Sequence, residues 1–179
     1  MVKRALFVGR FQPVHWGHVR ALNWVFSKLD VDEVVVVIGS AQESHTLRNP
    51  FTAGERFEML LRVSRRIAGP LHIVPVMDIS MNFVWVRYLE MLLPRFSVVV
   101  TRNPLVERLF SEYGYRVVGQ PLYERGLYSA TRIREMILRG DEGWRSLVPS
   151  EVLEYIEDIR GVERLRKIAS RDEDHGRPG

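Results

Sequence analysis

Five short runs of apolar residues, rich in valine and isoleucine, recur along the first two thirds of the chain. Each is nearly continuous rather than alternating with polar residues, which is typical of strands buried on both faces of a parallel sheet. The runs predict strands at residues 5–9, 34–38, 71–76, 96–100 and 115–118.

Between these runs, apolar residues recur at helical spacing, and the intervals predict helices at residues 19–29, 53–66, 83–93 and 105–113. Strands that alternate with helices form βαβ units and therefore a parallel sheet. The pattern predicts an α/β fold, a Rossmann-like open sheet of about five parallel strands with helices on both faces.

After residue 128 the strand pattern stops. Helical segments are predicted at residues 129–139, near Trp144, at residues 150–159 and at residues 162–168, which together form a short helical C-terminal extension. We expect one domain over residues 1–169. Residues 170–179 are polar and rich in charge, so they are predicted to form a disordered tail.

Composition narrows the class of protein. The chain has 179 residues, 46% of them hydrophobic, and no cysteine, which excludes disulfides, thiolate nucleophiles and cysteine-ligated metals. No run of 18 apolar residues and no leader pattern is present, so a soluble cytoplasmic protein without a membrane partner is expected. The net charge of +4 would suit nucleic acid, but it equally suits anionic nucleotides.

The first strand and the turn after it carry the clearest chemistry. The strand ends at Gly9, where a missing side chain lets a ligand approach the backbone. His15 and His18 follow at the start of a helix, whose free N–H groups favour anions. With the forked donor of Arg10, these histidines predict a phosphate site; an isolated pair of histidines could equally be a metal site or two unrelated surface residues.

The long polar loop at residues 39–55 is also expected to be functional, because it lies where ligands of open α/β sheets bind. Arg48 is its candidate phosphate contact. Arg56, on the helix that follows, is more readily explained by a solvated ion pair. Thr52 and Glu55 form a capping box at the start of that helix.

Other loop ends offer further candidates. Asn82 is predicted to cap the helix at 83–93, and spacing alone favours core packing for Trp85 over a flat surface for a planar ring. Asn103 is predicted to cap the next helix. Ser129 begins a helix that carries Arg134 near its first turn, a second site at which a helix start could bind an anion.

Several motifs together resemble a known family. The string G-R-F-Q-P-V-H-W-G-H at residues 9–18 resembles the GxFxPxHxGH signature of the nucleotidyltransferase superfamily, and a related H-x-G-H element occurs in class I aminoacyl-tRNA synthetases. The string S-A-T-R-I-R at residues 129–134 resembles the second signature of its adenylyltransferases. The blocks at residues 39–56, at Asn82 with Trp85-Val86, and at residues 103–106 resemble the archaeal nicotinamide-nucleotide (NMN) adenylyltransferases in order and spacing.

The resemblance implies transfer of AMP from ATP to NMN, giving NAD and pyrophosphate, without a covalent intermediate. It implies catalytic roles for His15, His18, Arg10 and Arg134. Nucleotide contacts are implied for Gly9, Phe11, Gln12, Arg48, Ile79, Asn82, Trp85, Asn103, Tyr128, Ser129 and Thr131. In this reading Asn82 and Trp85 lie at the nicotinamide pocket, Mg²⁺ bridges ATP phosphates without a metal site on the protein, and the chain forms a homo-oligomer, as its relatives do, often as hexamers.

Two positions depart from the family pattern. Ala130 stands where glycine or serine is usual, and Arg132 stands where an acidic residue is common, so nucleotide affinity is the property most open to change. The alternatives are the same chemistry on another acceptor phosphate (nicotinic acid mononucleotide, phosphopantetheine or FMN), a basic nucleic-acid-binding module, and a tRNA synthetase fragment. The arginines are scattered and no KMSKS-like string follows, which disfavours the last two.

Overall fold

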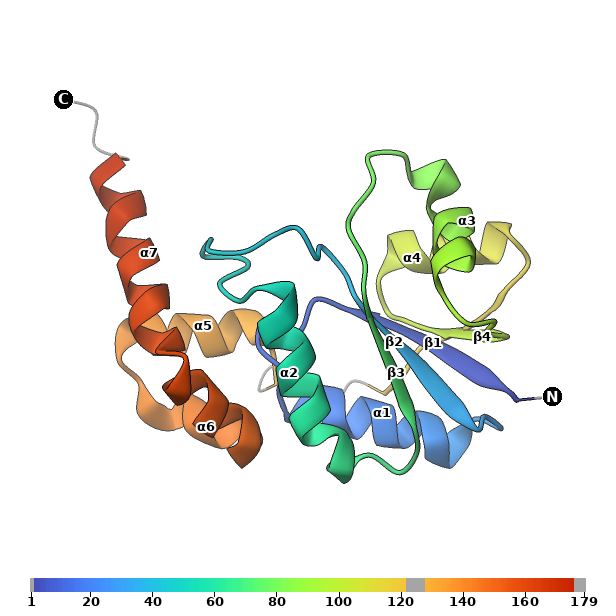
Figure 1. The fold of residues 1–179 in the computed structure, drawn as a ribbon, viewed down its shortest axis with the longest axis horizontal. Helices are drawn as coiled ribbons and strands as arrows, with labels where there is room; N and C mark the ends of the chain where they lie inside the picture. The colour runs from blue at the N-terminus through green and yellow to red at the C-terminus, as the bar shows by residue number, and fades with distance from the viewer. Residues whose placement is uncertain (1, 122–127, 176–179) are drawn as a thin grey trace.

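The computed structural model describes residues 2–121 and 128–175 and confirms the predicted parallel sheet (Figure 1). Its strands are β1 (Arg4–Gly9), β2 (Glu33–Ile38), β3 (Leu71–Pro75), β4 (Val98–Val100) and β5 (Arg116–Val118). Every neighbouring pair is parallel, in the order β3-β2-β1-β4-β5. The strand order reverses between β1 and β4, and the carboxyl ends of these strands border the crevice where open α/β sheets bind ligands.

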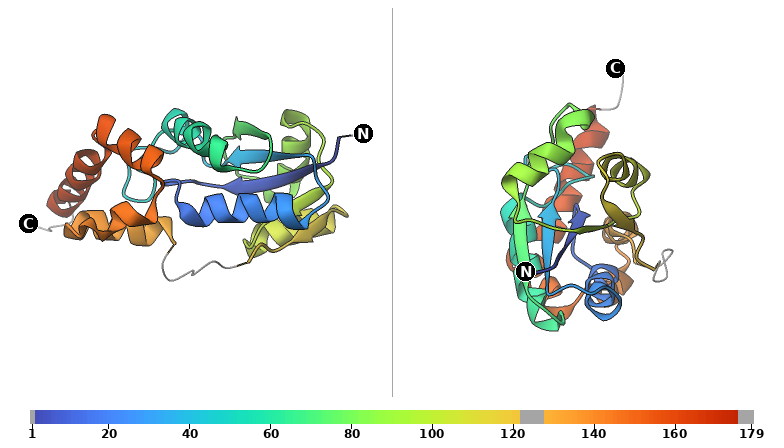
Figure 2. Two further views of the ribbon diagram at one scale, coloured as in Figure 1. Left: turned by 90° about the horizontal axis from the view of Figure 1, so that it is seen from below. Right: turned by 90° about the vertical axis from the view of Figure 1, so that its right-hand side faces the viewer.

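Helices cover both faces of the sheet, as predicted (Figure 2). Their bounds are α1 (Trp16–Lys28), α2 (Ala53–Val63), α3 (Asn82–Leu92), α4 (Pro104–Glu112), α5 (Ala130–Arg139), α6 (Ser150–Asp158) and α7 (Gly161–His175), with 3₁₀ turns η1 (Ser64–Arg66) and η2 (Glu142–Leu147). Helix α1 begins three residues before the predicted start, so the second histidine lies inside its first turn.

The alternation of side chains along each strand divides the core into two clusters. Ala5 and Phe7 of β1 point toward α1 and α2, whereas Leu6 between them points toward α3 and α4. Residues 34–38 of β2 are fully buried, as a central strand with helices on both faces requires. Helices packed on both faces of the sheet fix the positions of the strand ends, and the candidate residues lie at those ends.

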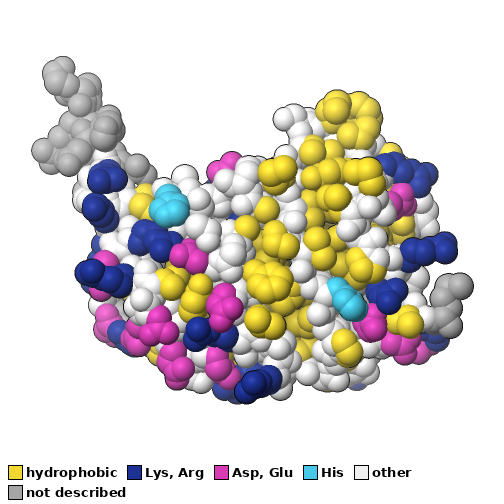
Figure 3. Space-filling model, in the orientation of Figure 1, with side chains coloured by type: hydrophobic (Ala, Val, Ile, Leu, Met, Phe, Trp, Pro, Cys, Tyr) yellow, Lys and Arg dark blue, Asp and Glu magenta, His cyan; other side chains and the backbone are white. Residues whose placement is uncertain are grey.

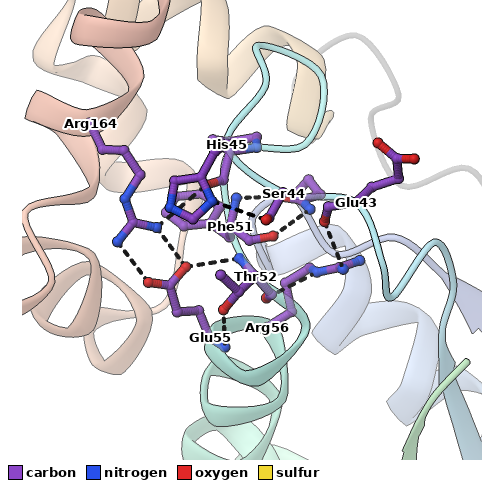
Figure 4. A network of polar contacts seen from close by, with 10 residues as sticks. Glu43, Ser44, His45, Phe51, Thr52, Glu55, Arg56 and Arg164 are labelled. Atoms are coloured by element: carbon purple, nitrogen blue, oxygen red, sulfur yellow. Dashed lines mark hydrogen bonds and ion pairs between the residues drawn. The ribbon is translucent and has the colours of Figure 1, made fainter. Parts of the chain in front are cut away.

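The C-terminal extension lies beyond the carboxyl ends of the strands (Figure 1). Helix α6 packs against α2, and α7 packs against α5. Arg164 of α7 forms a bidentate ion pair with Glu55, with two N–O distances of 2.7 Å, and Glu55 also accepts the backbone N–H of Thr52 in the predicted capping box (Figure 4). The extension is thus joined to the loop that precedes α2.

The C-terminal boundary differs from the sequence prediction. Helix α7 continues through residues 170–175, where a disordered tail was expected, while residues 176–179 lie outside the described part of the chain. Most of the segment between the last predicted strand and the helix predicted at residues 129–139 falls on residues 122–127, which are also outside it. Across residues 2–121 and 128–175, no helix combines the length and the apolar character needed to cross a membrane.

Candidate active site

The turn after β1 brings the first histidine motif into a compact arrangement. Phe11 has a left-handed backbone (φ 53°), and a cis peptide bond joins Gln12 to Pro13. The Phe11 ring is buried and lies 4.7 Å, between centroids, from the ring of His18. A Cβ atom on Gly9 would come within 2.8 Å of the Phe11 ring, so glycine is required for this packing rather than only for access by a ligand.

The two histidines stack against each other at the start of α1. Their ring centroids are 3.7 Å apart and the planes differ by 25°. The backbone N–H of His15 donates to Nδ1 of His18 at 3.2 Å, so the neutral His18 ring carries its proton on Nε2. His15 is buried, and its Nδ1 has no hydrogen-bond partner among the described residues.

Burial decides the charge of this pair. It lowers the pKa of His15 to about 4. It also lowers the pKa of His18 well below the usual value, and the adjacent His15 ring lowers it further. Both rings are therefore neutral hydrogen-bond donors near neutral pH in the unliganded protein.

A direct test of this assignment is the ¹⁵N spectrum of the histidine side chains as a function of pH. At about pH 6, where most free histidine is protonated, we expect both His15 and His18 to be neutral and His18 to show the Nε2–H tautomer. Between about pH 6.5 and pH 4 these histidines are protonated in the unfolded chain and neutral in the folded protein. The free energy of unfolding should therefore fall as the pH drops through this range. An imidazolium signal from either ring at about pH 6 would contradict the assignment.

Three candidate arginines lie close enough to influence one another. Burial lowers the pKa of Arg10, and the positive charge of Arg48 lowers it further. Burial likewise lowers the pKa of Arg134, with smaller contributions from Arg10 and Arg48. Like charges accumulated at one place in a fold destabilise the protein unless an anion neutralises them, so this cluster is suited to a polyphosphate.

Arg134 joins the two halves of the site. Its Nη1 donates to the carbonyl of Gln12 at 2.8 Å, its Nε donates to the carbonyl of Leu47 at 2.9 Å, and its Nη2 lies 3.4 Å from Oγ1 of Thr131. The predicted second anion site on α5 is therefore held against the turn after β1. His18 packs on Phe11, and Arg134 bonds the carbonyl of the next residue, Gln12. The histidines and Arg134 therefore contact the same turn after β1.

Gln12 has a different environment from the one implied by the resemblance. Its Nε2 donates to the carbonyl of Phe51, and its Oε1 accepts the N–H of Phe51, both at 2.9 Å. The side chain is only 2% exposed. Gln12 therefore holds the end of the 39–52 loop through hydrogen bonds like those between neighbouring strands, and both polar atoms of its side chain are used in them.

The remaining candidates on the α4 and α5 side lie as follows. Asn103 is the N-cap of α4, as predicted, and its Oδ1 accepts the N–H of Leu105 at 3.0 Å. Ser129 occupies the N-cap position of α5, where the sequence predicted the helix to begin, but its hydroxyl makes no capping hydrogen bond. The Tyr128 ring is covered by the guanidinium of Arg20, 4.7 Å from its centroid.

A separate pocket of about 240 Å³ lies between α3 and α4. Its lining includes Ile79, Asn82 and Trp85, together with Asp78, Leu105, Val106 and Leu109. Trp85 packs edge-on against Phe110 at 5.7 Å, so it belongs to the core and forms the pocket wall at the same time. Asn82 is the first residue of α3 and Met81 is the cap, which corrects the capping prediction and leaves the Asn82 amide at the pocket.

Two residues near the site were missed or misread in the sequence. Asp78 accepts the N–H of Ser40 at 3.2 Å and also lines the pocket, so it joins the exits of β2 and β3. The signal in the sequence was an acidic residue two positions after the strand predicted at residues 71–76, where ligand-binding residues of open α/β sheets lie. Arg56 forms no surface ion pair; it is fully buried and donates to backbone carbonyls.

The residues present do not form a metal site of their own. Within residues 2–121 and 128–175, no group of three or more His, Asp or Glu side chains is placed to hold a metal ion. Apart from the carboxylate of Asp78, the candidate side chains at the carboxyl ends of β1 and β2 are cationic or neutral, which suits an anion.

The chain is similar to several known proteins. Residues 6–136 match the family described as cytidylyltransferase-like. The nicotinamide-nucleotide adenylyltransferase of Pyrococcus horikoshii is 54% identical over 169 residues, covering 93% of this chain and 89% of its own. The enzyme of the same name from Saccharolobus solfataricus is 44% identical over 174 residues, covering 96% and 99%.

A solved structure shares the fold. A bifunctional NMN adenylyltransferase/ADP ribose pyrophosphatase from Francisella tularensis, crystallised with AMP and a manganese ion, superposes with a TM-score of 0.69 at 20% identity. The match covers 97% of this chain and 54% of the Francisella chain, so this chain spans about half the length of that bifunctional protein.

Proposed function

The chain belongs to the cytidylyltransferase-like family and, more narrowly, to the nicotinamide-nucleotide adenylyltransferases. On this basis we propose how it transfers AMP from ATP to NMN. The observation that supports the proposal is that the stacked histidines and Arg134 both contact the turn after β1, with Arg10 and Arg48 close enough to Arg134 to lower its pKa. The products are NAD and pyrophosphate. A cytoplasmic location is also part of the proposal.

The reaction needs no group on the protein that becomes covalently bound. A phosphate oxygen of NMN attacks the α-phosphorus of ATP, a new P–O bond forms, and the bond to the β-phosphate breaks with its electron pair leaving on pyrophosphate. Charge on the transferring group is spread over its equatorial oxygens in such transition states. Positioning and charge neutralisation by the protein are therefore sufficient for catalysis.

The side chains divide this work. His18 donates from Nε2–H to an α-phosphate oxygen, while His15 fixes that tautomer through its backbone N–H and stacks beneath the ring. Arg134 and Arg10 neutralise the triphosphate, and Arg48 contacts either the triphosphate or the phosphate of NMN. Mg²⁺ carried by ATP would supply further charge neutralisation.

The pocket between α3 and α4 is the proposed site of the nicotinamide ring. Trp85 offers an aromatic surface there, Asn82 offers an amide that can pair with the carboxamide, and Ile79 lines the remaining side. The adenine end of ATP is assigned to the region of Asn103, Tyr128 and the start of α5, with Ser129 and Thr131 as hydroxyl donors. The free hydroxyl of Ser129 is consistent with that assignment.

Replacement of Trp85 tests the nicotinamide assignment. Loss of an aromatic stacking surface should raise the KM for NMN by roughly 10- to 100-fold in Trp85→Ala, with a much smaller change in the KM for ATP. Arg87→Ala, an exposed residue on the same helix, is the matched control and should leave both KM values unchanged. Equal effects of Trp85→Ala on the two substrates would contradict the assignment and indicate a core defect.

We also propose that the chain assembles with copies of itself. Strand β3 is an edge strand with one neighbour, and large apolar side chains are exposed beside it on α3, among them Phe83 (68% exposed) and Met91 (74% exposed). Hydrophobic side chains gather over this side of the molecule in Figure 3. A surface of this kind favours a protein partner, and a homo-oligomer, with a hexamer as one closed form, is testable by light scattering.

The experiment that tests the function is pyrophosphate release from ATP with each acceptor in turn. NMN should support the highest kcat/KM, and nicotinic acid mononucleotide, phosphopantetheine and FMN serve as competitors. If FMN or phosphopantetheine were the better acceptor, the chemistry would stand and the substrate assignment would be wrong. No release with any acceptor would overturn the function.

A further inference from the structure

Arg56 is a buried charge that the proposed mechanism does not use. Its side chain is 0% exposed at the start of α2, and burial, followed by the nearby charge of Arg10, lowers its pKa to about 10. Among the described residues no carboxylate forms an ion pair with its guanidinium, although the charge of Asp78 partly offsets the lowering of its pKa. A buried cation without a paired anion is costly, so its other contacts must stabilise it.

Those contacts are all backbone carbonyls: three lie at the exits of β1 and β2, and two, at Glu43 and Thr52, lie in the loop between β2 and α2 (Figure 4). Nη1 donates to the carbonyls of Arg10 at 3.0 Å and Gly39 at 2.8 Å. Nη2 donates to the carbonyl of Ser40 at 3.0 Å and lies 3.5 Å from that of Glu43, while Nε donates to Thr52 at 3.2 Å. One side chain therefore joins the exit of β1, the exit of β2 and both ends of the 40–52 loop.

The two exits are strained where the guanidinium binds them. Phe11, directly after Arg10, has φ 53°, and Ser40 has φ 50°. Residues other than glycine pay for a left-handed backbone and keep it only where surrounding contacts impose it. The hydrogen bonds from Arg56 to the carbonyls of Arg10 and Ser40 are placed to impose it at both turns.

Only a guanidinium can make this set of contacts. It presents five N–H donors in a rigid plane, whereas an ammonium group has three donors at a single point and cannot span carbonyls from three segments. Glu43 and the loop beyond it lead to Arg48, and Arg10 is itself one of the bonded residues. The orientation of both candidate phosphate contacts therefore depends on Arg56.

We propose that Arg56 is a positioning residue for adenylyl transfer: it fixes the exits of β1 and β2 so that Arg10 and the loop bearing Arg48 face the triphosphate. The inference rests on the proposed function, since it assigns the same site to ATP. Arg56 does not touch the substrate. It acts through the backbone of the residues that do.

The test compares Arg56→Lys and Arg56→Met with Arg62→Met, a control on the same helix whose arginine pairs with Glu58 at the surface. Kinetics are measured well below the unfolding temperature of each variant. Both Arg56 variants should lose roughly 100-fold in kcat/KM for ATP, because misplacement of contacts by about 1 Å has effects of that size. The KM for NMN should change little, and Arg62→Met should match the wild type.

A second substitution separates positioning from simple loss of stability. Ser40→Gly removes the cost of the left-handed backbone at that turn, so the Ser40→Gly/Arg56→Lys double variant should recover part of the lost kcat/KM for ATP. Wild-type kinetics in Arg56→Lys, or a loss that is equal for ATP and NMN and is not recovered by Ser40→Gly, would overturn the inference. Inactivity of the wild-type chain itself would instead reject the proposed function.

Discussion

His18→Ala is expected to lower kcat by roughly 100- to 1,000-fold while the KM for ATP changes only modestly, because the lost donor acts mainly on the transition state. The Nε2–H of His18 is fixed by the hydrogen bond from the His15 backbone to Nδ1, so it needs no reorganisation to reach the transferring phosphoryl group. In the ground state the arginines retain the triphosphate. Initial rates of pyrophosphate release over a range of ATP concentrations would measure both parameters.

Two further variants serve as controls for His18→Ala. His72→Ala removes a histidine from the edge strand β3, where the ring bonds Glu33 at 2.8 Å, and should leave kcat unchanged. His18→Gln keeps an N–H donor at the position and should retain more activity than His18→Ala. A kcat for His18→Ala equal to that of the wild type would remove this residue from the chemistry.

The parts of the site that could be predicted are those encoded by neighbouring residues. The five strands follow from uninterrupted valine-rich runs, and the turn at residues 9–18 is a local string in which glycine, proline and two histidines fall at fixed spacing. The capping boxes and caps at Thr52 and Asn103 are equally local, and the structure confirms both. Here pattern and tertiary context favour the same conformation.

The parts that could not be predicted depend on residues distant in sequence. Gln12 bonds Phe51, 39 positions away, and the carbonyls around Arg56 come from three segments. The sequence that flanks Gln12 or Arg56 does not distinguish these contacts from a ligand contact or a surface ion pair. Trp85 shows a related limit, because helical spacing predicts which side chains face the core but not that the core surface there also forms the wall of a pocket.

Arg134→Met is expected to lower kcat/KM for ATP by roughly 100-fold or more. Two lost charge-assisted hydrogen bonds to a polyphosphate, at about 1.5 kcal/mol or more each, amount to that factor. The same side chain also bonds the carbonyls of Leu47 and Gln12, so the variant should loosen the 39–52 loop as well. Arg134→Lys should recover little, because an ammonium group cannot bind both carbonyls and still face a phosphate.

Separate measurements distinguish the two roles of Arg134. Equilibrium binding of ATP reports the lost charge, and the unfolding temperature reports the loosened loop. Arg139→Met, on the same helix, removes an arginine that pairs with Glu135 at the surface and should leave both unchanged. If Arg134→Met bound ATP as tightly as the wild type and differed only in unfolding temperature, Arg134 would be a structural clamp, and the triphosphate would have to be held by Arg10 and Arg48 alone.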